Sequence, residues 1–356
     1  MNNKKFAKKL IMWYSVHKRE LPWRNTADPY KIWLSEIILQ QTRVAQGLPY
    51  YNKFVKHFEK IGDLAAASEQ EILRLWQGLG YYSRARNLHK CAKIVAENLQ
   101  GNFPFGYKNL LKLPGVGKYT AAAIASFAYK EPVAVIDGNV YRVLSRIFGI
   151  DDDISSGIGQ RKFEKVANEL ISEEQPDVYN QAIMEFGATH CTPKSPACGD
   201  CIFNMECYAR IHGQQKELPV KLGKVKVKSR YLHYLVFKNG EDMAMKQRKG
   251  NDIWKGLFDY MLFEESGFRD FDWLAGNNEF LDELTPYIKE VNISKDYKHV
   301  LTHRKLYARF FAIDLDQKEE VLSMIKRQGL RFFSHDDIHE LPKPVLVSRY
   351  LNDTIF

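Results

Sequence analysis

The 356-residue chain has few cysteines and no long apolar run. Five cysteines are too few for a scaffold built on disulfides, and no stretch reaches the about 18 uninterrupted apolar residues that a transmembrane helix needs. The first residues, MNNKKFAKKLIMWYSVHKRELPW, have a charged start but only a brief apolar run and no small-residue cleavage site. We therefore expect a cytoplasmic protein without a secretory signal or membrane span, in which clustered cysteines bind a metal.

The formal net charge of +9 is unevenly distributed along the chain. Residues 1–215 contain 28 basic and 21 acidic side chains, residues 216–230 contain 6 and 1, and residues 231–356 contain 18 and 21. A basic first part and a basic connector are consistent with a polyanionic partner, although many basic proteins bind no specific anion. The length predicts about two domains.

The hydrophobic pattern divides the chain into a helical part and a mixed part. In the first part, apolar residues recur at three- and four-residue spacing, as in KIWLSEIILQQTRVAQGLPYYNKFVKHF and KYTAAAIASFAY, with Asp28 and Asp137 as candidate helix caps. Later segments such as RYLHYLVFKNG and LRFFSHDDI are rich in aromatic and β-branched residues and predict strands. We expect an α-helical domain over 1–215, a basic linker over 216–229 and an α+β domain over 230–356.

Four of the five cysteines form one cluster, C-x(6)-C-x(2)-C-x(5)-C, within 17 residues. Thiolates bind soft metals such as iron and zinc. Zinc sites usually contain two close cysteine pairs, whereas this cluster has a single C-x(2)-C, so an iron–sulfur cluster is favoured. Cys91 stands alone on a helical pattern and is expected in the core. The predicted ligands are Cys191, Cys198, Cys201 and Cys207.

A glycine turn precedes the helical segment KYTAAAIASFAY. Gly115 and Gly117, in LPGVGKYT, permit backbone N–H groups to approach an anion, and the following helix adds its positive N-terminal end. A plain helix–helix turn is an equally common explanation of such a motif alone. Because a helical segment and no strand precedes the turn, it fits a helix-hairpin-helix that binds a DNA phosphate, with Lys118 as a further contact.

Together these segments resemble the helix-hairpin-helix superfamily of DNA glycosylases, which includes endonuclease III. The cysteine spacing is similar to the superfamily's [4Fe–4S] motif, and LSEIILQQT is similar to the L-S-E-x-x-L-Q-Q-T segment of its adenine DNA glycosylase (MutY) family. The likeness is closest over 20–210 and weaker over 230–310. It implies a helical glycosylase domain that holds a [4Fe–4S] cluster, followed by a Nudix-like domain.

The resemblance assigns two carboxylates to catalysis, Glu36 in LSEIIL and Asp137 in DGNVYR. A carboxyl packed among apolar side chains resists ionisation, so the pKa of Glu36 should rise toward that of a useful general acid. Glu36 would protonate adenine at N7 and then help to activate water, while Asp137 would stabilise the oxocarbenium-like sugar. The alternatives are a surface glutamate and a helix N-cap, and the cap is compatible with catalysis.

Tyr119 matches the active-site tyrosine of many family members and would hydrogen-bond the two carboxylates. Bifunctional endonuclease III enzymes carry at this position a lysine that forms the Schiff base needed for strand cleavage. Here the lysine, Lys118, lies one place earlier. We therefore predict a monofunctional glycosylase.

Further residues are assigned by the resemblance to reading the mispair, which requires extrusion of the target nucleotide. For each of them, ordinary packing or a solvated surface is the alternative. The residues that would enter the DNA near the orphaned base are Gln41 and Tyr81, supported by Leu39. Those that would line the adenine pocket or contact DNA beside it are Trp23, Arg24, Asn139 and Gln181.

The second domain resembles the Nudix-like domain of the same family in the segment NDIWKGLFDYMLFEE, with Trp254 and Gly256 as packing landmarks. The R-E-x-x-E-E array of Nudix hydrolases is missing, so we expect recognition without pyrophosphate hydrolysis. The family's F-S-H loop, which senses 8-oxoguanine, corresponds to Leu301, Thr302 and His303, where Leu and Thr replace Phe and Ser. The FSH at 333–335 lies too far downstream and is taken as coincidence.

The sequence thus predicts an enzyme that removes adenine mispaired with 8-oxoguanine, or with guanine, from double-stranded DNA. The expected location is cytoplasmic, at the nucleoid if the source is bacterial, and the expected state is a monomer with no membrane partner. Two alternatives stay open: a bifunctional glycosylase and lyase of the endonuclease III kind, and a non-catalytic DNA-binding iron–sulfur protein. Tyr119 and the extra domain argue against the first, and Glu36 and Asp137 against the second.

Overall fold

The computed structural model describes residues 3–223, 227–250 and 252–354. No helix in these ranges has the length and apolarity needed to cross a bilayer. Residues 224–226, in the middle of the predicted linker 216–229, lie outside the described residues.

The chain folds into two compact units. One comprises Met1–Ala66 and Asn87–Gly223, and the other comprises Ala67–Arg86 and Lys224–Phe356. The second unit therefore includes a short helical segment from the first half of the sequence. The sequence pattern placed that segment in the first domain, and the domain boundaries that it suggested stay a prediction.

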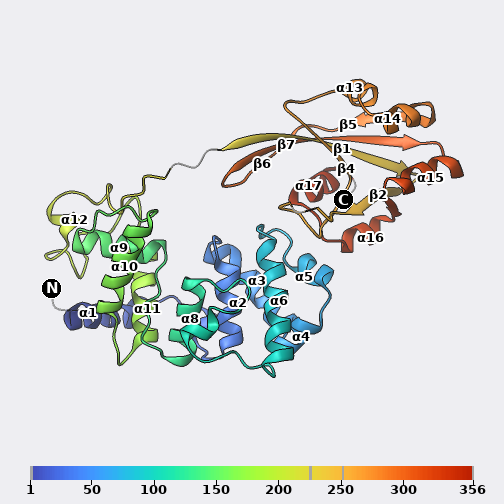
Figure 1. Cartoon of the computed structure of the whole chain (residues 1–356). Helices are drawn as coiled ribbons and strands as arrows, with labels where there is room; N and C mark the ends of the chain where they lie inside the picture. Colours follow the sequence, from blue (N-terminus) through green and yellow to red (C-terminus); the bar gives the residue numbers. More distant parts are fainter. Residues whose placement is uncertain (1–2, 224–226, 251, 355–356) are drawn as a thin grey trace. The chain divides into compact units, whose positions relative to one another are not determined.

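The first unit is built from helices, as predicted (Figure 1). Its α6 begins with a turn that belongs to the second unit. The elements are α1 Asn3–His17, η1 Pro22–Arg24, α2 Pro29–Leu39, α3 Val44–His57, α4 Ile61–Ala66, α6 Ser83–Asn98, α7 Tyr107–Leu110, α8 Lys118–Tyr129, α9 Gly138–Phe148, α10 Gly157–Leu170, α11 Pro176–Glu185, the π-helical turn η2 Phe186–His190 and α12 Tyr208–Ile211.

Both predicted aspartate caps are confirmed. The Asp28 carboxylate accepts a hydrogen bond from the Tyr30 N–H at 2.9 Å and starts α2. The Asp137 carboxylate accepts from the N–H groups of Asn139 and Val140, each at 2.8 Å, and starts α9. Each carboxylate satisfies donors that have no partner inside the helix.

The single helical pattern through KIWLSEIILQQTRVAQGLPYYNKFVKHF is interrupted in the structure. Helix α2 ends at Leu39 and α3 begins at Val44. Between them Gln41 has a φ of 54°, in the left-handed region that non-glycine residues rarely adopt. The connection is about one helical turn long, so the apolar residues stay in phase across it and periodicity does not detect the break.

The centre of this unit brings together helices α2, α8, α9 and α11. Helix α8 packs against α2 and α11, and α11 also packs against α9. The side chains from Ala121 to Ala125 are almost fully buried, and their small size lets the neighbouring backbones approach closely. The ends of these four helices carry most of the predicted active-site residues.

The second unit is an α+β structure, as predicted (Figure 1). Its sheet has the order β3-β2-β1-β7-β5, with β4 on β1, β6 on β7 and β8 on β2, and β1 and β7 run parallel. The strands are β1 Lys228–Asn239, β2 Asp242–Gln247, β3 Phe258–Asp259, β4 Met261–Glu265, β5 Ile288–Ile293, β6 Tyr297–Val300, β7 Arg304–Leu315 and β8 Arg331–Phe333. The helices are α5 Glu69–Leu75, α13 Phe271–Gly276, α14 Glu279–Leu284, η3 Thr285–Tyr287, α15 Glu319–Arg327, α16 His335–Glu340 and α17 Val345–Thr354.

The predicted strand LRFFSHDDI is only half right. Strand β8 stops at Phe333, and Ser334 caps α16 by accepting from the Asp337 N–H at 3.2 Å. The Asp337 carboxylate in turn accepts from the Ser334 N–H and hydroxyl, which completes a capping box. The FSH triplet at 333–335 therefore has its serine occupied in a helix cap.

Candidate active site

A cavity of about 190 Å³ in the first unit brings the two predicted catalytic carboxylates together. Glu36 comes from α2, Tyr119 from the first turn of α8 and Asp137 from the N-terminus of α9. Five other predicted residues line the same cavity: Trp23, Arg24, Leu39, Asn139 and Gln181. All seven residues suggested for the adenine pocket and its chemistry thus line one cavity, and they come from five separate segments of the chain.

Glu36 is only 5 % exposed and lies among buried apolar residues of α2. Burial raises the pKa of Glu36 to about 7, because a charge is costly in a poorly solvated site. A hydrogen bond from the Tyr119 hydroxyl opposes this rise, and the nearby Asp137 carboxylate adds to it. The predicted upward shift is confirmed, and Glu36 can carry a proton near neutral pH.

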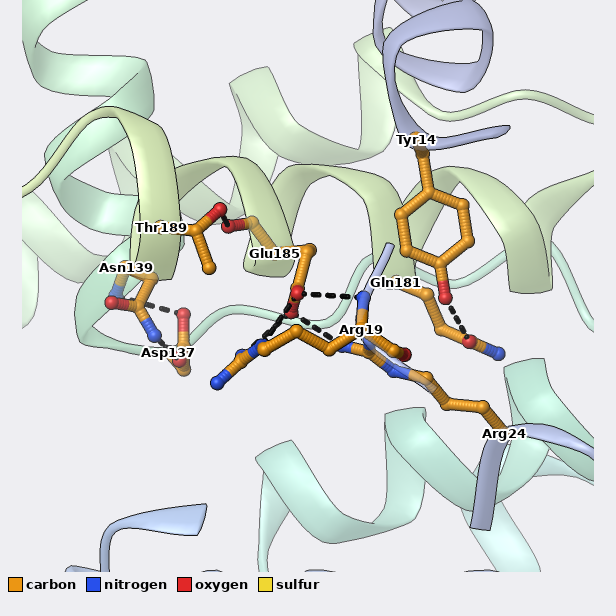
Figure 2. Close-up of polar contacts among 8 residues, drawn as sticks. All are labelled: Tyr14, Arg19, Arg24, Asp137, Asn139, Gln181, Glu185 and Thr189. Atoms are coloured by element: carbon orange, nitrogen blue, oxygen red, sulfur yellow. Dashed lines mark hydrogen bonds and ion pairs between the residues drawn. The ribbon is translucent and has the colours of Figure 1, made fainter. Parts of the chain in front are cut away.

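Asp137 is held by three hydrogen bonds. The cap bonds occupy Oδ1, and the Asn139 side chain donates to Oδ2 at 2.6 Å (Figure 2). Burial raises the pKa of Asp137, while the bonds from Val140 and Asn139 favour its charged form and oppose that rise. The positive N-terminal end of α9 also favours a carboxylate. Burial thus raises the pKa of both carboxyls, but only Asp137 has three hydrogen bonds and a helix N-terminus that favour its charged form.

Glu185 is a third carboxylate of the cavity, and the sequence patterns did not indicate it. Its side chain is fully buried between two arginines: Arg19 Nε and Nη2 donate at 2.6 and 2.7 Å, and Arg24 Nη2 donates at 2.6 Å (Figure 2). Burial alone would raise the pKa of Glu185, but the hydrogen bonds and charges of the two arginines hold it at about 2. Glu185 therefore stays ionised and fixes both guanidinium groups beside the cavity.

Helical spacing could have indicated Glu185 from the position of Gln181. Gln181 and Glu185 are four residues apart on α11, so they share one helix face. The Tyr14 hydroxyl donates to Gln181 Oε1 at 2.7 Å and fixes the orientation of that amide (Figure 2). Arg19, by contrast, is set in an exposed connection after α1, where nothing in the sequence separates it from other surface arginines.

A chain of hydrogen bonds links Asp137 to the cysteine segment. Asn139 binds Asp137, Arg142 Nη2 donates to Asn139 Oδ1 at 2.8 Å, and Arg142 Nε donates to the Cys191 carbonyl at 2.7 Å. Arg142 also donates to the Gly187 carbonyl at 2.6 Å. A Cβ on Gly187 would lie 2.7 Å from the Asn139 Cβ, so only glycine allows η2 to pack this closely against α9.

The four clustered cysteines line one small cavity. Among the described residues, no three histidine, cysteine, aspartate or glutamate side chains are arranged to hold a single metal ion. Arg146, 2 % exposed, donates to Cys191 Sγ at 3.4 Å and to the Thr192 and Pro193 carbonyls at 2.7 and 3.0 Å. Four thiols that line one cavity provide the ligand number of an iron–sulfur cluster, and the buried guanidinium of Arg146 lies beside one of them.

The helix-hairpin-helix turn has the expected form. Gly115 has a φ of 74°, and a Cβ there would lie 2.8 Å from the Asn87 Cβ, so glycine is required. Gly117 is the N-cap of α8 and faces open space. Lys118 is exposed and donates to Glu164 Oε1 at 2.7 Å, away from the cavity residues.

The remaining predicted residues lie outside the cavity. Gln41 is exposed in the connection after α2, in the first unit. Tyr81 belongs to the second unit, is 44 % exposed and has a φ of 49°. Leu301, Thr302 and His303 form the turn between β6 and β7, and the Thr302 hydroxyl lies 2.5 Å from the Tyr81 hydroxyl.

The second unit contains a cavity of about 470 Å³ near β2 and β3, but this cavity lacks a Nudix-type acid array. Its two carboxylates, Asp252 and Asp259, both pair with Arg248, the latter at 2.9 Å.

Comparisons with known proteins agree with this arrangement. The family model described as HhH-GPD superfamily base excision DNA repair protein matches residues 34–169, and a NUDIX domain model matches residues 233–353. An adenine DNA glycosylase of Buchnera aphidicola (Schizaphis graminum) is 32 % identical over 96 % of this chain and 96 % of its own length. The Buchnera aphidicola (Baizongia pistaciae) relative is 35 % identical over 85 % and 84 %.

The chain belongs to the adenine DNA glycosylase family. The human adenine DNA glycosylase is 43 % identical over 60 % of this chain, which corresponds to 41 % of the human protein. The family resemblance seen in the sequence is thus confirmed, and the chain is a DNA glycosylase of base excision repair whose partner is DNA.

Solved structures share the fold of the first unit. A thermostable thymine-DNA glycosylase superposes with a TM-score of 0.54 at 29 % identity, over 59 % of this chain and 97 % of that one. An endonuclease III in a non-covalent DNA complex gives a TM-score of 0.52 at 22 % identity, over 61 % of this chain and all of that one. At this identity the second likeness concerns the fold alone.

Proposed function

We propose that this family member hydrolyses the N-glycosidic bond of adenine paired with 8-oxoguanine, or with guanine, and does not cut the DNA strand. One observation carries the proposal: Glu36, whose pKa burial raises to about 7, lines the same cavity as Asp137, whose charged form is favoured by three hydrogen bonds. Glycosidic cleavage needs both roles, an acid for the leaving group and a negative charge for the sugar.

The proposed reaction begins with an adenine turned out of the duplex into the 190 Å³ cavity. Glu36 protonates N7, so that the base leaves as a neutral molecule. Asp137 stabilises the positive charge that develops on the sugar, and Glu36, now ionised, accepts a proton from the attacking water. The Tyr119 hydroxyl bonds Glu36 and keeps its carboxyl group oriented during these steps.

The arginine pair supports recognition of the base. Arg19 and Arg24 are both bound to Glu185, and the charge of Arg24 only partly opposes the rise in the pKa of Glu36 that burial causes. Trp23 is 9 % exposed and offers an aromatic face to a purine, while the Gln181 amide, fixed by Tyr14, offers hydrogen bonds to its edge.

The absence of a suitable amine supports the monofunctional assignment. A lyase needs a lysine at the sugar to form a Schiff base. The described residues that line the cavity include Arg19 and Arg24 but no lysine. Lys118, the nearest in sequence, is exposed and paired with Glu164.

For the opposite strand, we propose that Gln41, Tyr81 and Leu39 fill the gap in the duplex and that Leu301, Thr302 and His303 contact 8-oxoguanine. The left-handed backbones of Gln41 and Tyr81 support this, because non-glycine residues keep such strained conformations chiefly where function requires them. Gly115, Gly117 and Lys118 would bind the DNA phosphate backbone.

We further propose that Cys191, Cys198, Cys201 and Cys207 hold a [4Fe–4S] cluster. Burial raises the pKa of Cys201 to about 11, so binding requires loss of protons from the thiols. When bound, the cluster would hold the segment 191–207 in shape for contact with DNA. Analysis of iron and acid-labile sulfide in the purified protein tests this assignment.

Within the same proposal, the functional domains are a glycosylase domain over 1–215, a linker over 216–229 and a Nudix-like recognition domain over 230–356, in a monomer. The Nudix-like part recognises the lesion and hydrolyses no pyrophosphate, a role supported by the missing R-E-x-x-E-E array in its sequence.

Single-turnover excision on three duplexes tests the function: adenine opposite 8-oxoguanine, adenine opposite guanine, and thymine glycol opposite adenine. We expect adenine loss from the first two, with strand breaks only after treatment with alkali. Direct breaks in the third duplex would assign the chain to the bifunctional class. Tight DNA binding without any base loss would instead favour the non-catalytic DNA-binding iron–sulfur protein.

A further inference from the structure

The segment that carries Tyr81 is anchored inside the second unit. Residues 67–86 belong to that unit, and helix α5 buries Ile72 and Leu73 completely. Gly256 packs against this helix so closely that a Cβ would lie 2.9 Å from Leu73 Cδ1. The contact of Gly256 with Leu73 thus links this segment directly to the later part of the unit.

Gln77 connects the segment to two points near the C-terminus. Its Nε2 donates to Ser348 Oγ on α17 at 3.1 Å, and its Oε1 accepts from the Lys343 N–H at 3.1 Å. One side chain thus satisfies a hydroxyl and a backbone donor that are five residues apart in sequence.

The Lys343 side chain fixes the backbone segment to which Gln77 binds. Its ammonium group is 4 % exposed and donates to the carbonyls of Ile338, His339 and Leu341, the last two at 3.3 and 2.7 Å. Burial lowers the pKa of Lys343 to about 8. The Lys343 carbonyl also accepts from the Tyr82 hydroxyl at 3.4 Å. The backbone of Lys343 therefore binds Gln77 before Tyr81 and Tyr82 after it.

Tyr81 is then held at its outer end by the turn between β6 and β7. Its hydroxyl lies 2.5 Å from the Thr302 hydroxyl, and the Arg84 guanidinium lies over its ring at 5.6 Å. The left-handed backbone of Tyr81, a costly conformation, persists only if neighbouring contacts impose it. Those contacts come from within the second unit.

We propose that Gln77 and Lys343 are positioning residues that make Tyr81 part of the lesion-reading surface of the second unit. Neither touches the adenine cavity, and both act through the backbone between Gln77 and Tyr82. This inference rests on the proposed function, because its consequence is a preference between 8-oxoguanine and guanine. The adenine chemistry at Glu36 does not depend on it.

The test compares Gln77→Met with the native chain. Met keeps the volume and removes both hydrogen bonds. We expect the ratio of single-turnover rate constants for adenine opposite 8-oxoguanine and opposite guanine to fall about fivefold, the effect of one net hydrogen bond. Excision opposite guanine should change less than about twofold. Gln77→Glu, whose carboxylate can accept from Lys343 N–H and from the Ser348 hydroxyl, should restore much of the ratio.

Gln160→Met is the matched control, since Gln160 is an exposed residue of α10 with a single bond of 3.3 Å to the Ile154 carbonyl. It should leave the ratio unchanged. Ser348→Ala removes only the bond between Gln77 and Ser348 and gives a milder test if Gln77→Met folds poorly. An equal fall of both rate constants in Gln77→Met would indicate a merely structural effect and overturn the inference.

Hydrogen exchange on the DNA-free chain gives a readout that does not need activity. In Gln77→Met the amides of residues 78–84 should exchange about fivefold faster, while those of α8 keep the native rate. Unchanged hydrogen exchange at residues 78–84 would overturn the inference, whatever the excision rates of the variant are. Loss of adenine excision in the native chain, with faster exchange in the variant, would instead contradict the proposed function and keep the anchoring.

Discussion

Glu36→Gln is expected to lower the single-turnover rate of adenine excision opposite 8-oxoguanine by about 10²- to 10⁴-fold. Gln has nearly the same shape but cannot donate a proton to N7 or accept one from water. The Tyr119 hydroxyl can still bond the amide oxygen, so the cavity should keep its form. Glu97→Gln, the same change at an exposed position of α6, should leave the rate unchanged.

The stability of the same variant separates lost chemistry from lost fold. Because the folded-state pKa of Glu36 is raised from 4.5 to about 7, its contribution to stability is full below pH 4.5 and is lost as pH rises through about 7. Gln has no such loss. The free energy of unfolding of Glu36→Gln minus that of the native chain should therefore be about 2–3 kcal/mol larger at pH 8 than at pH 5. Unfolding in denaturant at the two pH values measures this difference.

A variant that is inactive and also less stable at both pH values would contradict the account, because misfolding would then explain the lost activity. So would an active Glu36→Gln, because Glu36 is the acid assigned to N7 and the two arginines hold the pKa of Glu185 at about 2.

Asp137→Asn should reduce excision by at least about 10²-fold, with a loss of stability of about 1–2 kcal/mol because the amide nitrogen that replaces Oδ2 cannot accept the hydrogen bond from the Asn139 side chain. Asparagine is as good a helix cap as aspartate, so the bonds from Asn139 and Val140 N–H groups can persist. The lost quantity is the negative charge beside the developing sugar cation. Single-turnover rates and thermal unfolding on the same preparation measure the two effects.

Asp28 supplies the matched control. It caps α2 as Asp137 caps α9, accepting from the N–H two residues ahead, but it does not line the cavity. Asp28→Asn should leave both rate and stability nearly unchanged. If Asp28→Asn and Asp137→Asn lowered excision alike, the role of Asp137 would be that of a cap and not of a catalytic charge.

The sequence predicted the parts of this protein that depend on local patterns. Asp28 and Asp137 were recognisable as caps because a cap needs only a short polar side chain before an apolar helix. The rise in the pKa of Glu36 followed from its apolar neighbours in α2. The α+β character of the second unit followed from its β-branched and aromatic segments, and the family followed from the motifs.

What the sequence did not predict depends on contacts between distant segments. Glu185 is ionised only because Arg19 and Arg24 reach it from the region after α1, some 160 residues away. The left-handed turn at Gln41 leaves the apolar period intact. Residues 67–86 belong to the second unit and contact it through pairs such as Gln77 and Lys343, which no local pattern indicates.

The pH dependence of single-turnover adenine excision opposite 8-oxoguanine tests the central claim, that Glu36 acts as a protonated acid. The account predicts a rate constant that is level below about pH 7 and falls about tenfold per pH unit above it, as the Glu36 carboxyl loses its proton. A rate constant that stays level from about pH 6 to about pH 9, with the duplex saturated throughout, would contradict it.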